Sequence, residues 1–213
     1  MTRIKCCGMT RVEDALLAVQ LGADAVGLVF TARSPRMVAL AQACAIRDAL
    51  PPFVSVVALF MDDRAEWVRE VVAAVQPDLL QFHGNERDDW CAQFGRPFAK
   101  AIAMGEGEAA LARLRDFPRA AALLLDGHGL GEAGGSGKPF DWSLVPAQAG
   151  KPLILAGGLN PDNVAQAVRR ARPWAVDVAS GIESAPGIKH PERLAAFIRA
   201  VRAVDAEQSP PSA

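Results

Sequence analysis

The sequence predicts a fold of the α/β class, a single closed (β/α)8 TIM barrel with eight parallel strands. Its 213 residues suit one domain and are near the lower limit for such a barrel. Short apolar runs alternate with amphipathic helical patterns, and the runs lack the polar alternation of half-exposed strands. An open doubly wound sheet is the alternative, but eight such units without an antiparallel interruption favour the barrel.

The expected strands are Arg3–Cys7, Ala25–Phe30, Val54–Phe60, Leu79–Phe82, Phe98–Ile102, Ala121–Leu125, Leu153–Ala156 and Ala175–Ala179. The expected helices are Val12–Leu21, Ala41–Leu50, Arg64–Val75, Asp88–Phe94, Asp162–Ala171 and Pro191–Val204. Glycine or proline follows several helices, where a left-handed cap or a stop is needed. We assign residues 1–205 to one catalytic domain and the polar, proline-rich residues 206–213 to a disordered C-terminal tail.

Composition and charge exclude several classes of protein. With 51% hydrophobic residues and a net charge of −1, the chain is typical of a soluble globular protein and has no overall attraction to nucleic acid or anionic membrane. No segment approaches the ~18 apolar residues of a membrane span, and no signal peptide is evident. The four cysteines form neither a disulfide framework nor a metal-ligand spacing. We therefore expect a cytoplasmic protein.

Cys7 is the first candidate catalytic residue, because it ends the first strand and active sites of this fold lie at the carboxyl ends of the strands. Successive strand side chains point to opposite faces, so Lys5 and Cys7 are expected inside the barrel and Cys6 against the helices. A free cysteine is often a small buried hydrophobe, which is our interpretation of the other three.

Asp126 is the second candidate, at the end of the sixth strand. A partly desolvated carboxylate there would have a raised pKa and could donate a proton; capping of the following turn is the alternative. The next segment, Gly127–Gly137, is too glycine-rich for a helix. We predict a loop that closes over a ligand, with a passive linker as the alternative.

Two glycine-containing loops after the seventh and eighth strands predict a phosphate site. In LAGGLNPDNV (155–164) a glycine pair precedes a helix that opens at Asn160 or Pro161, which presents bare backbone N–H groups. DVASG (177–181) follows on the next strand, as in the phosphate sites of this architecture. The residues expected around the phosphate and its sugar are Gly157, Gly158, Asp177, Ser180 and Gly181.

His83 and Arg36 are further polar residues at strand ends. His83 is either a base or a hydrogen-bonding residue of the wall. Arg36 follows Pro35, which stiffens its loop, so that the guanidinium could grip a carboxylate in a bidentate way. A solvated charge is the alternative for Arg36.

Taken together, these motifs resemble the phosphoribosylanthranilate isomerase family of tryptophan biosynthesis. Their order and spacing cover essentially the whole chain. The matching motifs are KCCGMT (5–10), SPR (34–36), QFHG (81–84), LLLDG (123–127), GGSGKPFDW (134–142), LAGGLNPDNV (155–164) and DVASGIES-PGIKH (177–190, with Ala185 before the proline).

The resemblance implies an intramolecular aldose–ketose isomerase. Its reaction is the Amadori rearrangement of N-(5-phosphoribosyl)anthranilate to 1-(2-carboxyphenylamino)-1-deoxyribulose 5-phosphate. Asp126 would act as general acid, Cys7 as general base, and Arg36 would bind the anthranilate carboxylate. The phosphate would lie near Gly158 and Gly181. The expected partner is this small phosphorylated substrate, with no metal or cofactor, and the chain is expected to be a monomer or homodimer.

Two positions depart from the family pattern. Cys6 replaces a usual isoleucine, and strand parity selects Cys7 as the catalytic cysteine. Ala179 replaces the first of two serines, which is expected to weaken phosphate affinity. We also expect Lys5 to lower the pKa of Cys7 from about 8.5. The rival interpretations are a related barrel, such as indoleglycerol-phosphate synthase or a pentose-phosphate epimerase, and a non-catalytic barrel that binds a phosphorylated ligand.

Overall fold

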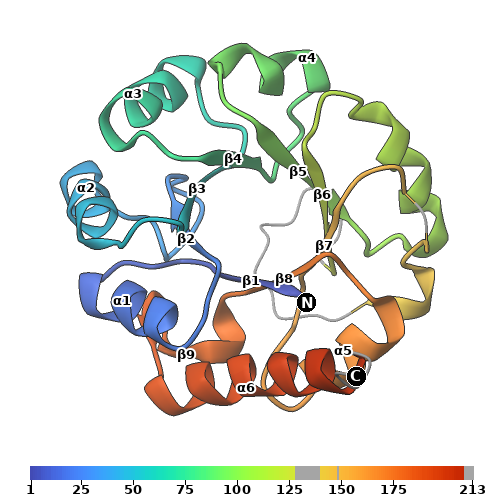
Figure 1. Cartoon of the computed structure of the whole chain (residues 1–213). Coiled ribbons are helices and arrows are strands. Elements are labelled where there is room, and N and C mark those ends of the chain that lie inside the picture. Colours follow the sequence, from blue (N-terminus) through green and yellow to red (C-terminus); the bar gives the residue numbers. More distant parts are fainter. Residues whose placement is uncertain (128–139, 148, 209–213) are drawn as a thin grey trace.

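A computed structural model describes residues 1–127, 140–147 and 149–208. Eight parallel strands close into one barrel in chain order, and pairing of the first with the last closes the ring (Figure 1). This confirms the predicted barrel and excludes the open sheet. The strands are β1 (Arg3–Cys6), β2 (Ala25–Val29), β3 (Ser55–Phe60), β4 (Leu79–Phe82), β5 (Phe98–Ala103), β6 (Ala122–Asp126), β7 (Leu153–Leu155) and β8 (Ala175–Val178).

Helices form a ring around the barrel (Figure 1). The α-helices are α1 (Val12–Gln20), α2 (Leu40–Ala49), α3 (Ala65–Val75), α4 (Asp88–Cys91), α5 (Val164–Ala171) and α6 (Pro191–Gln208). The 3-10 helices are η1 (Ala92–Phe94), η2 (Gly107–Asp116), η3 (Trp142–Leu144) and η4 (Ser180–Ile182). A short antiparallel pair, β9 (Glu183–Ala185) and β10 (Ile188–Lys189), follows η4. The sequence analysis predicted neither this pair nor η2.

The last helix extends further than predicted. Residues 206–208, which we assigned to the tail, form the end of α6. The reason is tertiary: Arg169 of α5 donates to Glu207 at 3.0 Å and anchors this last turn. Residues 209–213 lie outside the described residues. So does the predicted closing loop, apart from its first residue, Gly127.

The core has two layers. Between barrel and helices lie large side chains, including the stacked rings of Phe30 and Phe60 at 5.7 Å, and Cys6 belongs to this layer. Inside the barrel the apolar residues are mostly small, such as Ala99 and Ala101. Small residues inside the barrel leave space for long polar side chains to reach the carboxyl ends of the strands.

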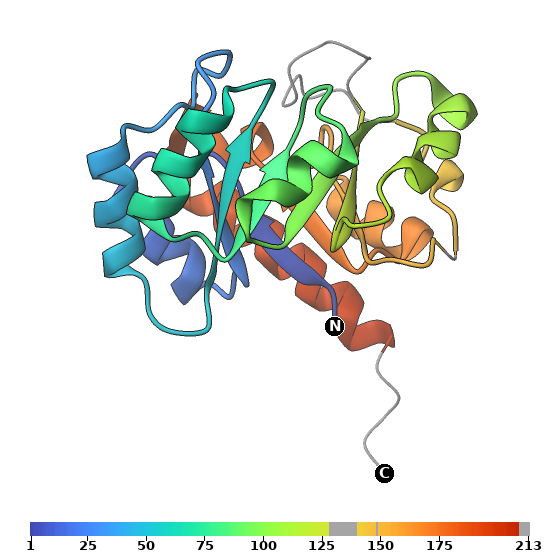
Figure 2. The same cartoon turned by 90° about the horizontal axis from the view of Figure 1, so that it is seen from above.

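The two ends of the barrel differ. In Figure 2 the strands point upward, and the N-terminus and the end of α6 lie at the lower end. The polar pocket described below lies at the carboxyl ends, as expected for this fold. No helix in the described part of the chain has the length and apolarity needed to cross a bilayer.

Candidate active site

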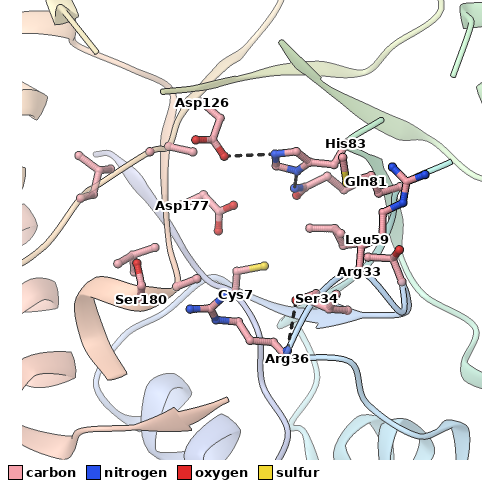
Figure 3. A pocket seen from close by; sticks show the side chains of 18 of the residues that line it. Cys7, Arg33, Ser34, Arg36, Leu59, Gln81, His83, Asp126, Asp177 and Ser180 are labelled. Carbon is pink, nitrogen blue, oxygen red and sulfur yellow. Dashed lines mark hydrogen bonds and ion pairs between the residues drawn. The ribbon is translucent and has the colours of Figure 1, made fainter. Parts of the chain in front are cut away.

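One pocket collects most of the predicted site residues (Figure 3). It contains about 710 Å³ of empty space including its open mouth. The predicted residues that line it are Cys7, Arg36, His83, Asp126, Gly157, Gly158, Asp177 and Ser180. Gly181 instead lines a neighbouring hollow together with Asn160 and Arg193, and Ser180 lies between the two.

Cys7 lies above a buried ion pair inside the barrel. Lys5 Nζ is 2.9 Å from both carboxylate oxygens of Asp177, and both side chains are more than nine-tenths buried. A Cβ on Gly27 would lie 2.6 Å from Cys7 Sγ and 3.1 Å from Lys5 Cε, so both side chains occupy the barrel interior. The register therefore places Cys7 inward, as strand alternation predicts.

The direction of the Cys7 pKa differs from our expectation. Burial raises the pKa of the thiol, and the nearby Lys5 ammonium, which lowers it, offsets this only in part. Burial also opposes the charge of Lys5, yet Asp177 and Cys7 outweigh it and keep the pKa of Lys5 above its usual value. Lys5 is thus positively charged and lies beside a thiol whose pKa is raised.

Asp126 and His83 are joined at the opposite wall of the pocket. His83 Nε2 lies 3.1 Å from Asp126 Oδ2, and Gln81 Nε2 lies 3.2 Å from His83 Nδ1 (Figure 3). Which ring nitrogen of His83 donates in these two contacts depends on the tautomer of the ring. His83 therefore has a defined partner in the site. Gln81 lies in β4, and His83 directly follows the end of that strand.

Arg36 has an internal carboxylate partner that the sequence did not suggest. Its Nε donates to Glu183 at 2.9 Å and its Nη2 at 2.8 Å. Lys189 Nζ donates to the same carboxylate at 2.8 Å and to the carbonyl of Cys7 at 2.6 Å. Burial raises the pKa of Glu183, but these hydrogen bonds and charges outweigh it, so the pKa is below its usual value. The proline–glycine pair at 186–187 between two short runs was a hairpin signal for this region.

The two glycine loops lie against each other and against Asp126. Gly157 and Gly158 have φ values of +81° and +64°, a region that favours glycine. A Cβ on Gly157 would lie 2.9 Å from Asp126 Oδ1 and would collide with the backbone nitrogen of Gly127. A Cβ on Gly181 would collide with the carbonyl oxygen of Leu159. Only glycine allows these loops to approach so closely.

The helix after the glycine pair starts later than predicted. It begins at Val164 because the side chain of Asn160 forms a turn, accepting the N–H groups of Asp162 at 2.9 Å and Asn163 at 3.2 Å. Those two N–H groups are therefore used internally. The first N–H groups of η4, which begins at Ser180, have no partner within that short helix.

The pocket also contains residues that the sequence analysis missed. Thr31, Arg33 and Ser34 line it from the loop after β2, and Gln81 lines it from β4. Arg33 is half-exposed and donates to Asp62 at 3.1 Å. The polar run TARSPR after a strand was the available signal. Within the described residues, no three His, Cys, Asp or Glu side chains gather as metal ligands would.

Comparison with known proteins gives one consistent result. A family model described as N-(5'phosphoribosyl)anthranilate (PRA) isomerase matches residues 4–200. The chain is 54% identical over 200 residues to the N-(5'-phosphoribosyl)anthranilate isomerase of Pseudomonas paraeruginosa, covering 94% of this chain and 95% of that protein.

Solved structures agree with the sequence comparison. Phosphoribosyl anthranilate isomerase from Thermotoga maritima superposes with a TM-score of 0.88 at 40% identity, over 95% of this chain and all of that one. A second structure, of monomers generated from the dimeric Thermotoga maritima protein, gives 0.85 at 35% over the same shares. A complex of the isomerase with reduced 1-(o-carboxyphenylamino)-1-deoxyribulose 5-phosphate gives 0.81 at 36%, again over 95% of this chain and all of that one.

Proposed function

This chain belongs to the N-(5'-phosphoribosyl)anthranilate isomerase family, and from that premise we propose which of its residues carry out the isomerisation. The chain is an isomerase of tryptophan biosynthesis whose substrate is N-(5'-phosphoribosyl)anthranilate. The observation that carries the residue assignment is that Cys7 and Asp126 face one cavity from different walls (Figure 3). A reaction that only moves protons needs an acid and a base on either side of the sugar.

In the proposed sequence, Asp126 protonates the furanose ring oxygen. The C1′–O bond breaks as the nitrogen lone pair forms a C1′=N bond, giving a protonated Schiff base. The Cys7 thiolate then removes the proton from C2′, and the electron pair of that bond neutralises the iminium to give an enolamine. A proton moves from the C2′ hydroxyl to C1′, which leaves the ketone. Loss of the proton that Cys7 took up and gain of one by Asp126, exchanged through solvent, restore both groups and balance the proton count.

The remaining pocket residues bind the two anionic ends of the substrate. Arg36 binds the anthranilate carboxylate through the part of its guanidinium that Glu183 does not use. The phosphate lies at the left-handed glycine pair Gly157–Gly158 and at the start of η4, where Ser180 and Gly181 supply N–H groups. Ala179 offers no hydroxyl there, so phosphate affinity is lower than with serine.

The two adjacent cysteines provide the test of the base. Cys7→Ser is expected to lose most of the activity, because a serine hydroxyl is a far weaker base than a thiolate. Cys6→Val is the matched control: Cys6 is fully buried in the outer layer, and its variant should retain near-wild-type turnover. Asp126→Asn should likewise lose most of the turnover. The decay of substrate fluorescence measures all three, and near-wild-type turnover of Cys7→Ser contradicts the assignment.

The amino end of the barrel supports a homodimer as the oligomeric state. Phe53 is fully exposed there in a strained conformation with φ +69°, beside a hollow lined by Trp174, Ile154 and Leu79. One face thus carries a protruding ring and an apolar hollow, which suits a two-fold symmetric contact. A related isomerase from Thermotoga maritima is described as dimeric. The four free thiols support a cytoplasmic location.

Sedimentation equilibrium tests the dimer. The wild-type chain should sediment as a dimer and Phe53→Asp as a folded monomer. Met37→Asp, which places the same charge on another exposed apolar residue outside that hollow, should remain dimeric. A wild-type monomer at micromolar concentration contradicts the proposal.

A further inference from the structure

Three charged side chains form a buried cluster where the β9–β10 pair meets the pocket. Glu183 accepts hydrogen bonds from Arg36 and from Lys189, and its side chain is 5% exposed. Lys189 is fully buried, and Arg36 is 12% exposed. The backbone N–H of Gly187 also donates to Glu183, at 3.2 Å. The carboxylate is thus held from three sides.

Glu183 occupies one edge of the Arg36 guanidinium. That edge consists of Nε and Nη2, and a guanidinium has five N–H donors, so three remain. Of the described residues, only Glu183 accepts from this side chain, although Arg36 lines the pocket. The free donors belong to Nη1 and the outer hydrogen of Nη2, which form the second bidentate edge.

Arg36 is also held along its stem. A Cβ on Gly8 would lie 2.5 Å from Arg36 Cδ, so the aliphatic chain packs directly on the glycine that follows Cys7. Lys189 donates to the carbonyl of Cys7 at 2.6 Å. The cluster therefore links the base, the arginine and the β9–β10 pair in one rigid unit.

The cluster contains two cations and one anion. The neighbouring acidic residues have cations of their own: Asp177 is paired with Lys5 at 2.9 Å, and Asp14 with Arg11 at 2.7 Å. Asp14 also accepts the backbone N–H of Lys189 at 2.9 Å. Burial of an unbalanced charge is costly unless another group compensates for it. While Cys7 is an uncharged thiol, one monoanion at the open edge of Arg36 would bring the cluster to neutrality.

We propose that Glu183 is a positioning residue that turns the open edge of Arg36 toward the carboxylate of the substrate. This inference rests on the proposed function, in which Arg36 binds that carboxylate. It makes Glu183 a determinant of specificity for N-aryl substrates that carry an ortho carboxylate.

The test compares two reduced product analogues, one with the 2-carboxyphenyl group and one with a plain phenyl group. Calorimetry gives the dissociation constant of each. In Glu183→Gln the affinity for the carboxylated analogue is expected to fall about tenfold, as for loss of a buried charged hydrogen bond. The affinity for the phenyl analogue should change less than about twofold, because that ligand makes no use of the open edge.

Glu86→Gln is the matched control, since Glu86 is an equally buried glutamate that pairs with Lys100 at 3.3 Å and does not line the pocket. It should leave the ratio of the two affinities unchanged. Glu183→Asp retains the charge but is shorter, and should show a smaller loss of the same kind. It serves as the second variant if Glu183→Gln does not fold, which thermal unfolding will show.

Each outcome has one meaning. Equal weakening of both analogues by Glu183→Gln, or tighter binding of the carboxylated one, overturns the proposal. Arg36→Ala distinguishes failure of the Glu183 proposal from failure of the proposed function. If Arg36→Ala still prefers the carboxylated analogue as strongly as the wild type does, Arg36 does not bind the carboxylate, and the proposed function is wrong at that residue.

Discussion

His83 Nε2 lies 3.1 Å from Asp126 Oδ2, and both side chains are more than nine-tenths buried. A buried hydrogen bond of this kind restricts the rotation of the carboxyl group and so aims it at the pocket. We therefore predict that the histidine positions the proposed acid, in addition to forming part of the wall.

Replacement of His83 should lower turnover more than binding. General acid catalysis contributes about 10²–10⁴-fold, and we expect His83→Leu to lose roughly tenfold to a hundredfold of kcat with little change in KM. Steady-state kinetics measures the split. Gln81→Leu, which removes only the second contact of the ring, should show a smaller effect. A rise in KM at constant kcat would instead indicate that His83 contacts the substrate.

The pH dependence should reflect the buried thiol. Because burial raises the pKa of Cys7 and the thiolate is the active form, kcat/KM should still be rising with pH above neutrality. The profile of initial rates from pH 6 to 9.5 measures this. A rate that is constant from pH 6.5 upward would mean that the thiol ionises more easily than its burial implies, that Asp126 loses its proton over the same range, or that Cys7 is not the base.

Lys5 should influence both pH dependence and stability. In Lys5→Met the cation that lowers the pKa of Cys7 is lost, so the rising limb should move to higher pH. Asp177 also loses its partner, and an unpaired buried charge costs about 3–5 kcal/mol in the free energy of unfolding.

A double variant separates these two effects. Lys5→Met with Asp177→Asn removes the unpaired charge and should recover much of the stability in urea unfolding. The rise of kcat/KM should still occur at a higher pH than in the wild type, because Lys5 has a larger effect on the pKa of Cys7 than Asp177 has. Return of the limb to the wild-type pH would show that Lys5 does not act on the thiol.

Gly157 should tolerate no side chain. In Gly157→Ala the new methyl group would press on Asp126 and on the backbone of Gly127, so we expect about a hundredfold loss of kcat/KM, the scale on which misplaced groups act. Gly95→Ala is the matched control: its φ is +66°, and no atom lies within 4 Å of the new Cβ. Both variants carry the same backbone strain, of order 1 kcal/mol. Equal activity of Gly157→Ala and Gly95→Ala would show that the structure accommodates the methyl group at position 157 without moving Asp126.

Local patterns in the sequence were sufficient to predict the barrel and the inward position of Cys7. Strand periodicity and glycine or proline punctuation are local properties, so eight strands could be predicted with boundaries close to those observed. Strand alternation is equally local, and it placed Cys7 inside and Cys6 outside without knowledge of any neighbour. The fold then fixed which end of the barrel would hold the pocket.

Tertiary structure decided what each of these residues touches. Lys5 and Asp177 are 172 positions apart, Arg36 and Glu183 are 147 apart, and only closure of the barrel joins them. Such pairs leave no local pattern in one sequence. The pKa of Cys7 shows the same limit: the cation beside it was predicted, but the larger opposing effect of burial depends on how completely the surrounding strands exclude water.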